Sequence, residues 1–124
     1  MKNSISTNTA PAAIGPYSQA IVSGPTVYVS GQLPIDPSTG QMPQKASEQA
    51  RQSLTNIANI LSAAGSSLDK VLRVGIFMTD LADFQEVNEI YATFFSGAFP
   101  ARSTVQVAAL PRGAKIEIEA IAEL

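Results

Sequence analysis

The chain has 124 residues, of which 45% are hydrophobic and 15% charged, and its formal net charge is −2 at pH 7. Because it contains neither Cys nor His, it can form no disulfide, zinc finger, Cys nucleophile or Ser–His pair, and most hydrolase mechanisms are excluded. Its eight Lys and Arg residues are scattered singly and give no basic footprint for RNA or DNA.

The length suits one domain, residues 1–124, built around one core. The charged fraction is below the roughly 25% of typical soluble domains, so we expect part of the surface to lie in a subunit interface. The alternative is a monomer coated with Ser, Thr, Gln and Asn. The N-terminus has no signal-like apolar region, and no apolar run is long enough to cross a membrane. These features predict a cytoplasmic protein without a membrane partner.

The first third of the chain predicts a turn-like opening and then a hairpin. Residues 1–13 are polar and rich in turn formers, whereas residues 18–22 and 26–30 are short apolar strands joined by a Ser-Gly-Pro turn. Residues 33–44 contain three Pro and one Gly, which indicates an ordered loop with at most a short edge strand.

The middle of the chain predicts an amphipathic helix followed by a buried strand. The helix is indicated by apolar residues at helical spacing, namely Ala46, Ala50, Leu54, Ile57, Ala58 and Leu61. Ser47 is a candidate N-cap, and Gly65 lies where a left-handed residue after the helix is favoured. Residues 71–78 are rich in Val, Ile and Phe and predict a central strand.

The last part of the chain predicts a second helix and a C-terminal hairpin. Asp83 and Glu86 form a capping-box-like start, and Gly97 is expected to end the helix. Its apolar stripe consists of Phe84, Val87, Tyr91, Phe94 and Phe95. Residues 103–110 and 115–123 are the expected arms of the hairpin, with the turn at 111–113. The order ββαβαββ predicts an α+β fold in which two helices cover one face of a mixed sheet.

Two charged residues are candidates for chemistry. Arg102 lies where a helix exit meets a strand, with no acidic neighbour in sequence, and a planar guanidinium binds carboxylates bidentately. Glu117 alternates with apolar residues in the last strand and could orient or deprotonate a water. The alternative interpretations are an exposed Arg at a strand end and a solvated sheet face.

Four further residues are candidates for lining a pocket. Asn88 lies at the edge of the apolar stripe of the second helix, and Tyr17 follows a rigid Gly-Pro pair. Ser30 and Gly31 end the second strand of the hairpin, where a Gly permits close approach of a ligand to the backbone. Each position also has a purely structural interpretation: a surface amide, an aromatic that covers the core, and a strand end.

Taken together, the sequence motifs resemble those of the reactive-intermediate/imine deaminase (Rid, YjgF-type) family. The similarity runs in order from about residue 9 to residue 122 and is carried by Gly15-Pro16-Tyr17-Ser18-Gln19-Ala20, Val29-Ser30-Gly31-Gln32, Asn56-Ile57 through Ala63-Ala64-Gly65, Asp80-Leu81-Ala82-Asp83-Phe84 with Val87-Asn88, Pro100-Ala101-Arg102-Ser103, and Lys115-Ile116-Glu117-Ile118-Glu119-Ala120.

The resemblance implies a chorismate-mutase-like α+β fold, assembled as a homotrimer with clefts between subunits. The implied activity is hydrolysis of 2-imino acids, formed from 2-aminoacrylate or 2-aminocrotonate, to 2-oxo acids and ammonia, with no metal or organic cofactor. Arg102 would bind the substrate carboxylate and Glu117 would handle the attacking water. The implied pocket residues are Tyr17, Ser30, Gly31, Asn88 and Thr104. Thr104 stands where many members have Cys.

This chemistry agrees with the residues available, since a protonated C=N is already a strong electrophile and needs neither Cys nor His. If the turn at 111–113 closes a hairpin, Glu117 and Arg102 lie about 13–17 Å apart at ~3.3 Å per residue. We therefore expect the site to combine Arg102 of one subunit with Glu117 of its neighbour. An endoribonuclease and a non-catalytic carboxylate-binding module remain the alternatives. The acidic composition argues against an endoribonuclease. The Glu117 carboxylate argues against a simple carboxylate-binding module, because a negative charge near the site does not help to bind an anion.

Overall fold

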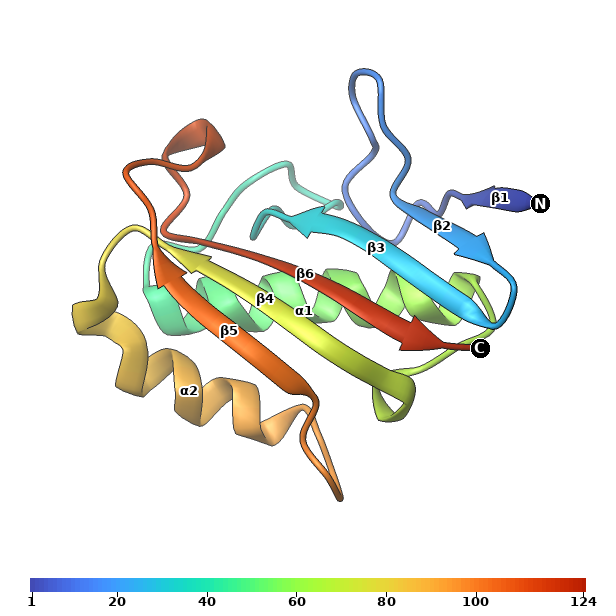
Figure 1. The fold of residues 1–124 in the computed structure, drawn as a ribbon. Helices are drawn as coiled ribbons and strands as arrows, with labels where there is room; N and C mark the ends of the chain where they lie inside the picture. The colour runs from blue at the N-terminus through green and yellow to red at the C-terminus, as the bar shows by residue number, and fades with distance from the viewer.

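The computed structural model describes residues 1–124 and consists of a six-stranded sheet and two α-helices (Figure 1). The strands are β1 (Lys2–Ile5), β2 (Ala20–Ser23), β3 (Thr26–Gln32), β4 (Val71–Met78), β5 (Ala101–Gln106) and β6 (Ile116–Glu123). The helices are α1 (Ala46–Ala63) and α2 (Phe84–Thr93). No helix combines the length and the apolar character that crossing a membrane requires.

The sheet has the strand order β1-β2-β3-β6-β4-β5. Only β4 and β5 pair in parallel, and every other pair of neighbours is antiparallel. The predicted mixed sheet and α+β class are therefore confirmed, as is the β2–β3 hairpin with its turn before Thr26.

The predicted C-terminal hairpin is wrong. β5 is an edge strand that pairs only with β4, and β6 runs between β3 and β4. The segment β4–α2–β5 is a parallel βαβ unit, in which a helix carries the chain back to the start of the neighbouring strand. The residues around Arg112 connect two strands that do not touch, so the expected pairing of Glu117 with residue 106 or 107 does not occur. Glu117 pairs with Phe77 of β4 instead.

The predicted ends of several elements also need correction. Residues 2–5 form β1 on β2 rather than a turn, because a polar strand at a sheet edge needs only backbone hydrogen bonds. α1 begins at Ala46 with Lys45 as its N-cap residue, so Ser47 does not cap it. Before α2, Asp80 rather than Asp83 caps the chain, since its Oδ1 accepts from the Ala82 N–H at 2.9 Å.

Gly65 ends α1 as predicted. Its φ of 85° is in the left-handed region, and the next N–H, of Ser66, donates to Leu61 O at 2.8 Å. This is the Schellman arrangement, which satisfies carbonyls that the helix end leaves free.

Both helices pack on one face of the sheet and leave the other face open (Figure 1). The core lies between the helices and the sheet, where Leu54, Ile57, Ile76 and Ile118 are at most 1% exposed. The open face lies toward the viewer in Figure 1 and carries Tyr28 and Val105, both about half exposed, together with Glu117 and Glu119. No element of this chain covers it.

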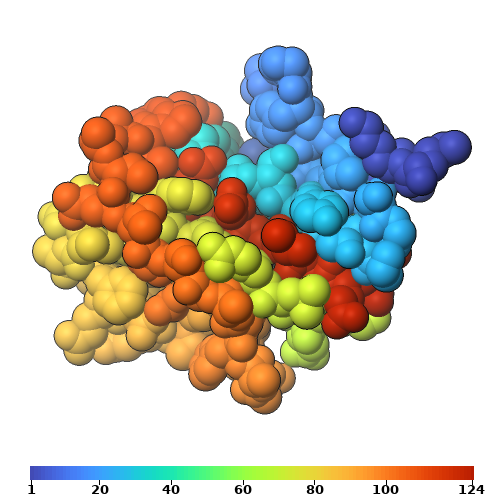
Figure 2. Space-filling model, in the orientation of Figure 1, coloured from blue at the N-terminus to red at the C-terminus, as the bar shows by residue number.

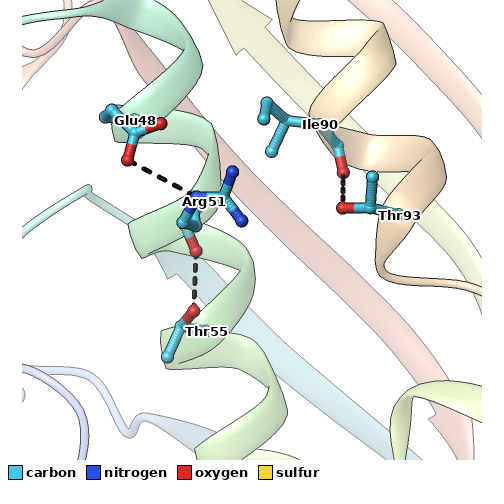
Figure 3. A network of polar contacts seen from close by, with 5 residues as sticks. All are labelled: Glu48, Arg51, Thr55, Ile90 and Thr93. Atoms are coloured by element: carbon cyan, nitrogen blue, oxygen red, sulfur yellow. Dashed lines mark hydrogen bonds and ion pairs between the residues drawn. The ribbon is translucent and has the colours of Figure 1, made fainter.

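The helices α1 and α2 lie side by side, and Figure 3 shows some of the polar contacts they make within themselves. Glu48 and Arg51 on α1 form an ion pair at 3.4 Å, and Thr55 Oγ1 donates to Arg51 O at 2.8 Å. On α2, Thr93 Oγ1 donates to Ile90 O at 2.6 Å. The Glu48–Arg51 pair is the only ion pair in the structure, and it lies on the outer surface.

Candidate active site

Arg102 lies on the helix side of the edge strand β5, next to α2. It pairs with the buried Val74 of β4, and paired residues share a face of the sheet. Its Nη1 donates to Asn88 Oδ1 at 2.8 Å, and its Cζ stands 4.7 Å from the ring centre of Tyr91 and 5.5 Å from that of Phe84. The guanidinium therefore meets a neutral amide and two aromatic faces, and no carboxylate.

A cavity of about 490 Å³ opens beside this guanidinium. Arg102, Asn88, Tyr91 and Phe99 line it. Burial raises the pKa of Tyr91 above its ordinary value, against a lowering by the Arg102 charge, so the phenol stays neutral. Its hydroxyl has no hydrogen-bond partner. The result is a cationic, partly aromatic pocket suited to a small anion.

Thr104 follows on the same face of β5, opposite the buried Ile76. Its Oγ1 is buried without a hydrogen-bond partner, and its side chain does not line the cavity beside Arg102. The outer edge of β5 is unpaired, so backbone groups of this strand remain free to bind a ligand.

Glu117 lines a second cavity, of about 560 Å³. Its side chain belongs to the open face of the sheet, whereas Arg102 is on the face that the helices cover. Tyr17, Ser30, Gly31 and Arg112 line the same cavity. In the space-filling view it is the hollow between the blue segment that includes residues 11–17 and the red-orange segment around residues 111–113 (Figure 2). Arg102 takes no part in it.

Gly31 makes room for the Glu117 carboxyl group. A β-bulge between Val29 and Gln32 interrupts the pairing of β3 with β6 and turns Gly31 toward that side chain. A Cβ at position 31 would stand 2.9 Å from Glu117 Cδ and closer still to Oε2. The same arrangement recurs at Gly75, where a Cβ would meet Glu119 Oε2 at 2.9 Å.

The position of Glu117 also affects its acidity. Burial raises the pKa of the Glu117 carboxyl above its ordinary value, and the negative charge of Glu119 raises it further. A raised pKa makes the ionised carboxylate a stronger base. Glu117 therefore has the electrostatic character expected of a group that takes a proton from water.

Hydrogen bonds hold the segment that carries Tyr17 against β3. Ser30 Oγ donates to Ser18 O at 2.6 Å, and the Ser30 N–H donates to Gln19 O at 2.9 Å. The buried Gln19 amide in turn donates to Pro11 O at 2.7 Å and accepts from the Thr7 N–H at 2.7 Å. These bonds hold Ser30 and the segment of Tyr17 together, and both residues line the cavity, with the Tyr17 side chain half exposed.

Two buried amides of α1 fix the loop on the opposite wall. Asn56 Nδ2 donates to Leu33 O and Ile35 O, at 3.2 and 3.0 Å. Gln49 Nε2 donates to Pro43 O at 2.8 Å, and its Oε1 accepts from the Lys115 N–H at 2.8 Å. Because buried polar groups of this kind are costly to leave unpaired, they hold the loop 33–45 and the start of β6 in one arrangement.

The predicted site residues thus fall into two half-sites. We call Arg102 and Asn88, with Thr104 beside them, the cationic half-site, and Glu117, Gly31, Ser30 and Tyr17 the carboxylate half-site. Within the chain the two do not meet. No group of three or more Asp and Glu side chains is placed to hold a metal ion.

Two of the residues beside these groups were not among the predicted site residues. The sequence pattern predicts Tyr91 only as part of an apolar stripe, whereas its ring lies against the Arg102 guanidinium. The sequence pattern predicts Arg112 only as a turn residue, whereas it lines the cavity of Glu117. Asn88 and Tyr91 are three residues apart and so share one face of the helix. This spacing is a signal that could have identified Tyr91 as a site residue.

Comparison with known proteins shows which family the chain belongs to. A family model described as endoribonuclease L-PSP matches residues 7–124. The chain is 54% identical over 119 residues to the mouse 2-iminobutanoate/2-iminopropanoate deaminase, covering 95% of this chain and 88% of that protein.

Two solved structures share its fold over nearly the whole length. Escherichia coli TdcF with bound serine has a TM-score of 0.95 at 46% identity, covering 98% of both chains. RidA from the Antarctic bacterium Psychrobacter sp. PAMC 21119 has a TM-score of 0.95 at 47% identity, covering 98% of this chain and 99% of that one. With a family model that spans residues 7–124 and relatives near 50% identity along the chain, this protein belongs to the YjgF/Rid family.

Proposed function

We propose that this protein is a 2-iminobutanoate/2-iminopropanoate deaminase, which hydrolyses reactive 2-imino acids to 2-oxo acids and ammonia. The names of its relatives support the reaction. The binding of serine to the related TdcF supports a small substrate in which a carboxylate and a nitrogen share one carbon. The observation that carries the proposal is the Arg102 guanidinium, which lines a cavity with no carboxylate of its own to pair with.

Each half-site supplies one part of the reaction. Arg102 binds the substrate carboxylate through paired N–H donors, and Asn88 orients the guanidinium from behind. Glu117 takes a proton from water while the water oxygen bonds to the imine carbon. Glu117 then returns the proton to the nitrogen of the carbinolamine, the C–N bond breaks while the hydroxyl group gives its proton to the carboxylate, and ammonia leaves. Tyr17, Gly31 and the strand around Thr104 enclose the substrate. No step calls for a metal or an organic cofactor.

We further infer that the protein is a homotrimer of the chorismate-mutase-like kind, with sites between subunits. The uncovered sheet face supports this assembly, since it exposes the large apolar side chains of Tyr28 and Val105. The separation of the two half-sites supports it as well, because neither cavity holds both a free carboxylate and Arg102. A neighbouring copy that brings its cationic half-site to the carboxylate half-site completes the pocket.

A coupled assay tests the reaction. A PLP-dependent threonine dehydratase generates 2-iminobutanoate, and the appearance of 2-oxobutanoate is followed with and without this protein. We expect the wild type to accelerate the reaction and Arg102→Ala to lose on the order of a hundredfold or more in kcat/KM, because a charge-assisted contact to the carboxylate is removed. Equal acceleration by the two proteins would overturn the proposal.

The same preparations separate the rival functions. Cleavage of a defined RNA that persists in Arg102→Ala, without imine turnover by the wild type, would favour an endoribonuclease. Tight binding of 2-oxobutanoate without turnover would favour a carboxylate-binding module. The Glu117 carboxylate argues for catalysis, since a second negative charge weakens simple capture of an anion.

A further inference from the structure

Arg112 is the only residue other than Gly whose backbone lies in the left-handed region. Its φ is 59° and its ψ is 21°, between Pro111 and Gly113 in the connection that leads into β6. Residues that carry a Cβ atom rarely adopt this backbone conformation. Where the surrounding structure enforces it, the residue is often one that acts at a site.

The side chain of Arg112 lines the cavity that holds Glu117. Its one polar contact is a long hydrogen bond, at 3.4 Å, from Nη2 to the carbonyl oxygen of Gly40, and it has no ion pair. Since a guanidinium has five N–H donors, most of its hydrogen-bonding capacity is free. A second unpaired cation therefore stands at the wall of the proposed active site, apart from Arg102.

The cavity is larger than the substrates of the proposed reaction require. In the single chain, before a neighbouring subunit contributes to it, the volume is about 560 Å³, which is in the range that holds drug-sized ligands, whereas 2-iminobutanoate has only seven non-hydrogen atoms. Much of the cavity lining is apolar, with Pro11, Leu33 and Ile35 among the lining residues beside the two charged groups. A ligand that fills it would combine methylene groups with a negatively charged end at Arg112.

We propose that Arg112 binds the distal carboxylate of 2-imino dicarboxylic acids, and that these acids form a further substrate class of this site. The inference rests on the proposed function. Arg102 of the neighbouring subunit holds the carboxylate next to the imine carbon, Glu117 receives the proton of the attacking water, and the substrate side chain extends along the apolar wall to Arg112. One water is consumed, its oxygen becomes the carbonyl oxygen, the C–N bond breaks and ammonia leaves.

The charge of Arg112 favours 2-imino dicarboxylic acids over imines with large apolar side chains. The apolar part of the cavity wall by itself could accept either class. An apolar end placed against the guanidinium would cover its free N–H donors without replacing their contacts to water, which is unfavourable. A carboxylate at the same place accepts from those donors and neutralises the charge.

The test compares two imines in one assay. An L-glutamate oxidase with catalase generates 2-iminoglutarate, the dehydratase generates 2-iminobutanoate, and semicarbazide traps the imine that the protein has not yet hydrolysed. We expect the wild type to accelerate the hydrolysis of both. In Arg112→Gln the ratio of kcat/KM for 2-iminoglutarate to that for 2-iminobutanoate should fall about tenfold or more, and Arg112→Lys should recover part of the loss.

Arg51→Gln is the matched control, since it removes one Arg from the outer surface of α1 and should leave the ratio unchanged. Circular dichroism confirms that each variant is folded. The inference is overturned if the wild type hydrolyses 2-iminobutanoate alone, or if Arg112→Gln lowers both activities equally or neither. Failure of the wild type to accelerate either reaction would overturn the proposed function itself, and with it this inference.

Discussion

Arg102 and Glu117 project from opposite faces of one sheet. Arg102 is paired with Val74 of β4, and Glu117 with Phe77 of the same strand. Positions 74 and 77 differ by an odd number of residues, so their side chains point to opposite sides. Two strand spacings of about 4.8 Å and three residues of about 3.3 Å place the two Cα atoms about 14 Å apart. One small imino acid cannot touch both side chains of the same chain.

The first prediction concerns Asn88, whose Oδ1 accepts from Arg102 at 2.8 Å. Asn88→Asp puts a carboxylate at the same place, where it pairs with the guanidinium and competes with the substrate carboxylate. We expect KM for 2-iminobutanoate to rise by about tenfold or more in Asn88→Asp, and by less in Asn88→Ala, which removes only one hydrogen bond. Steady-state kinetics measure both, and a larger effect of the Ala variant would contradict this account of Asn88.

How far the site could be predicted depends on how local its determinants are. The helix α1 and the strand β4 follow from the period of their own apolar residues, and the residues 71–78 predicted as a strand agree with its observed limits. Arg102 and Glu117 were identified by their place in an ordered series of motifs. None of these predictions depends on which strands are neighbours in the sheet.

What could not be predicted depends on strand pairing. A tight turn before Lys115 suggested a hairpin, but the crossover through α2 makes β5 the parallel neighbour of β4 and leaves the middle of the sheet to β6. The expected separation of Arg102 from Glu117 therefore holds, although the hairpin that motivated it does not. The contact of Gly31 with Glu117 depends on the bulge between β3 and β6, which only the register of distant strands creates.

The second prediction concerns Gly31, which leaves room for the Glu117 carboxyl group. Its φ is not in the left-handed region, so an Ala is compatible with the backbone, but the added Cβ would stand 2.9 Å from Glu117 Cδ. We expect Gly31→Ala to displace the carboxylate and to lower kcat by about tenfold or more, since small misplacements of a catalytic group are costly.

Gly75→Ala is its matched control. The Cβ added there displaces Glu119 rather than Glu117, and kcat should fall much less. The Gly31 effect should also vanish in a Glu117→Gln background, because the two changes act on one group. Additive losses in the double variant would show that Gly31 acts by another route.

The third prediction concerns pH. Burial and the charge of Glu119 hold the pKa of Glu117 above its ordinary value. The proton on Glu117 therefore favours the folded state below the pKa of the unfolded chain, and this contribution is lost as pH rises through the folded pKa. Glu117→Gln, neutral throughout, should then be as stable as the wild type or more stable near pH 8, with a smaller advantage near pH 4. Thermal unfolding across this range measures it.

The same substitution should lower kcat by about a hundredfold or more, because a general base is removed. In the wild type, kcat/KM should fall as pH drops through the raised pKa of Glu117. Glu119→Gln should move that fall to lower pH, since one source of the raised pKa is gone. Besides Glu119, the charged and titratable groups of the Glu117 cavity are Tyr17 and Arg112. An unchanged profile in Glu119→Gln would contradict the electrostatic coupling of the two carboxylates.

The last prediction concerns the sharing of sites between subunits. Arg102→Ala and Glu117→Gln are each expected to be nearly inactive, yet their mixed assemblies should regain activity. A site is complete when the Glu117→Gln subunit supplies Arg102 and the Arg102→Ala subunit supplies Glu117. With equal amounts and random assembly in a symmetric ring, about a quarter of the sites meet this condition. Co-expression with two affinity tags isolates the mixed assemblies.

The control mixes two variants of the same half-site, Arg102→Ala and Asn88→Asp. Every cationic half-site is then damaged whichever subunit supplies it, so activity should not exceed the mean of the two parent variants. Recovery in the first mixture alone identifies Arg102 and Glu117 as groups that different chains bring together. No recovery in either mixture would mean that one chain bends both residues to the substrate, against the opposite faces from which they project.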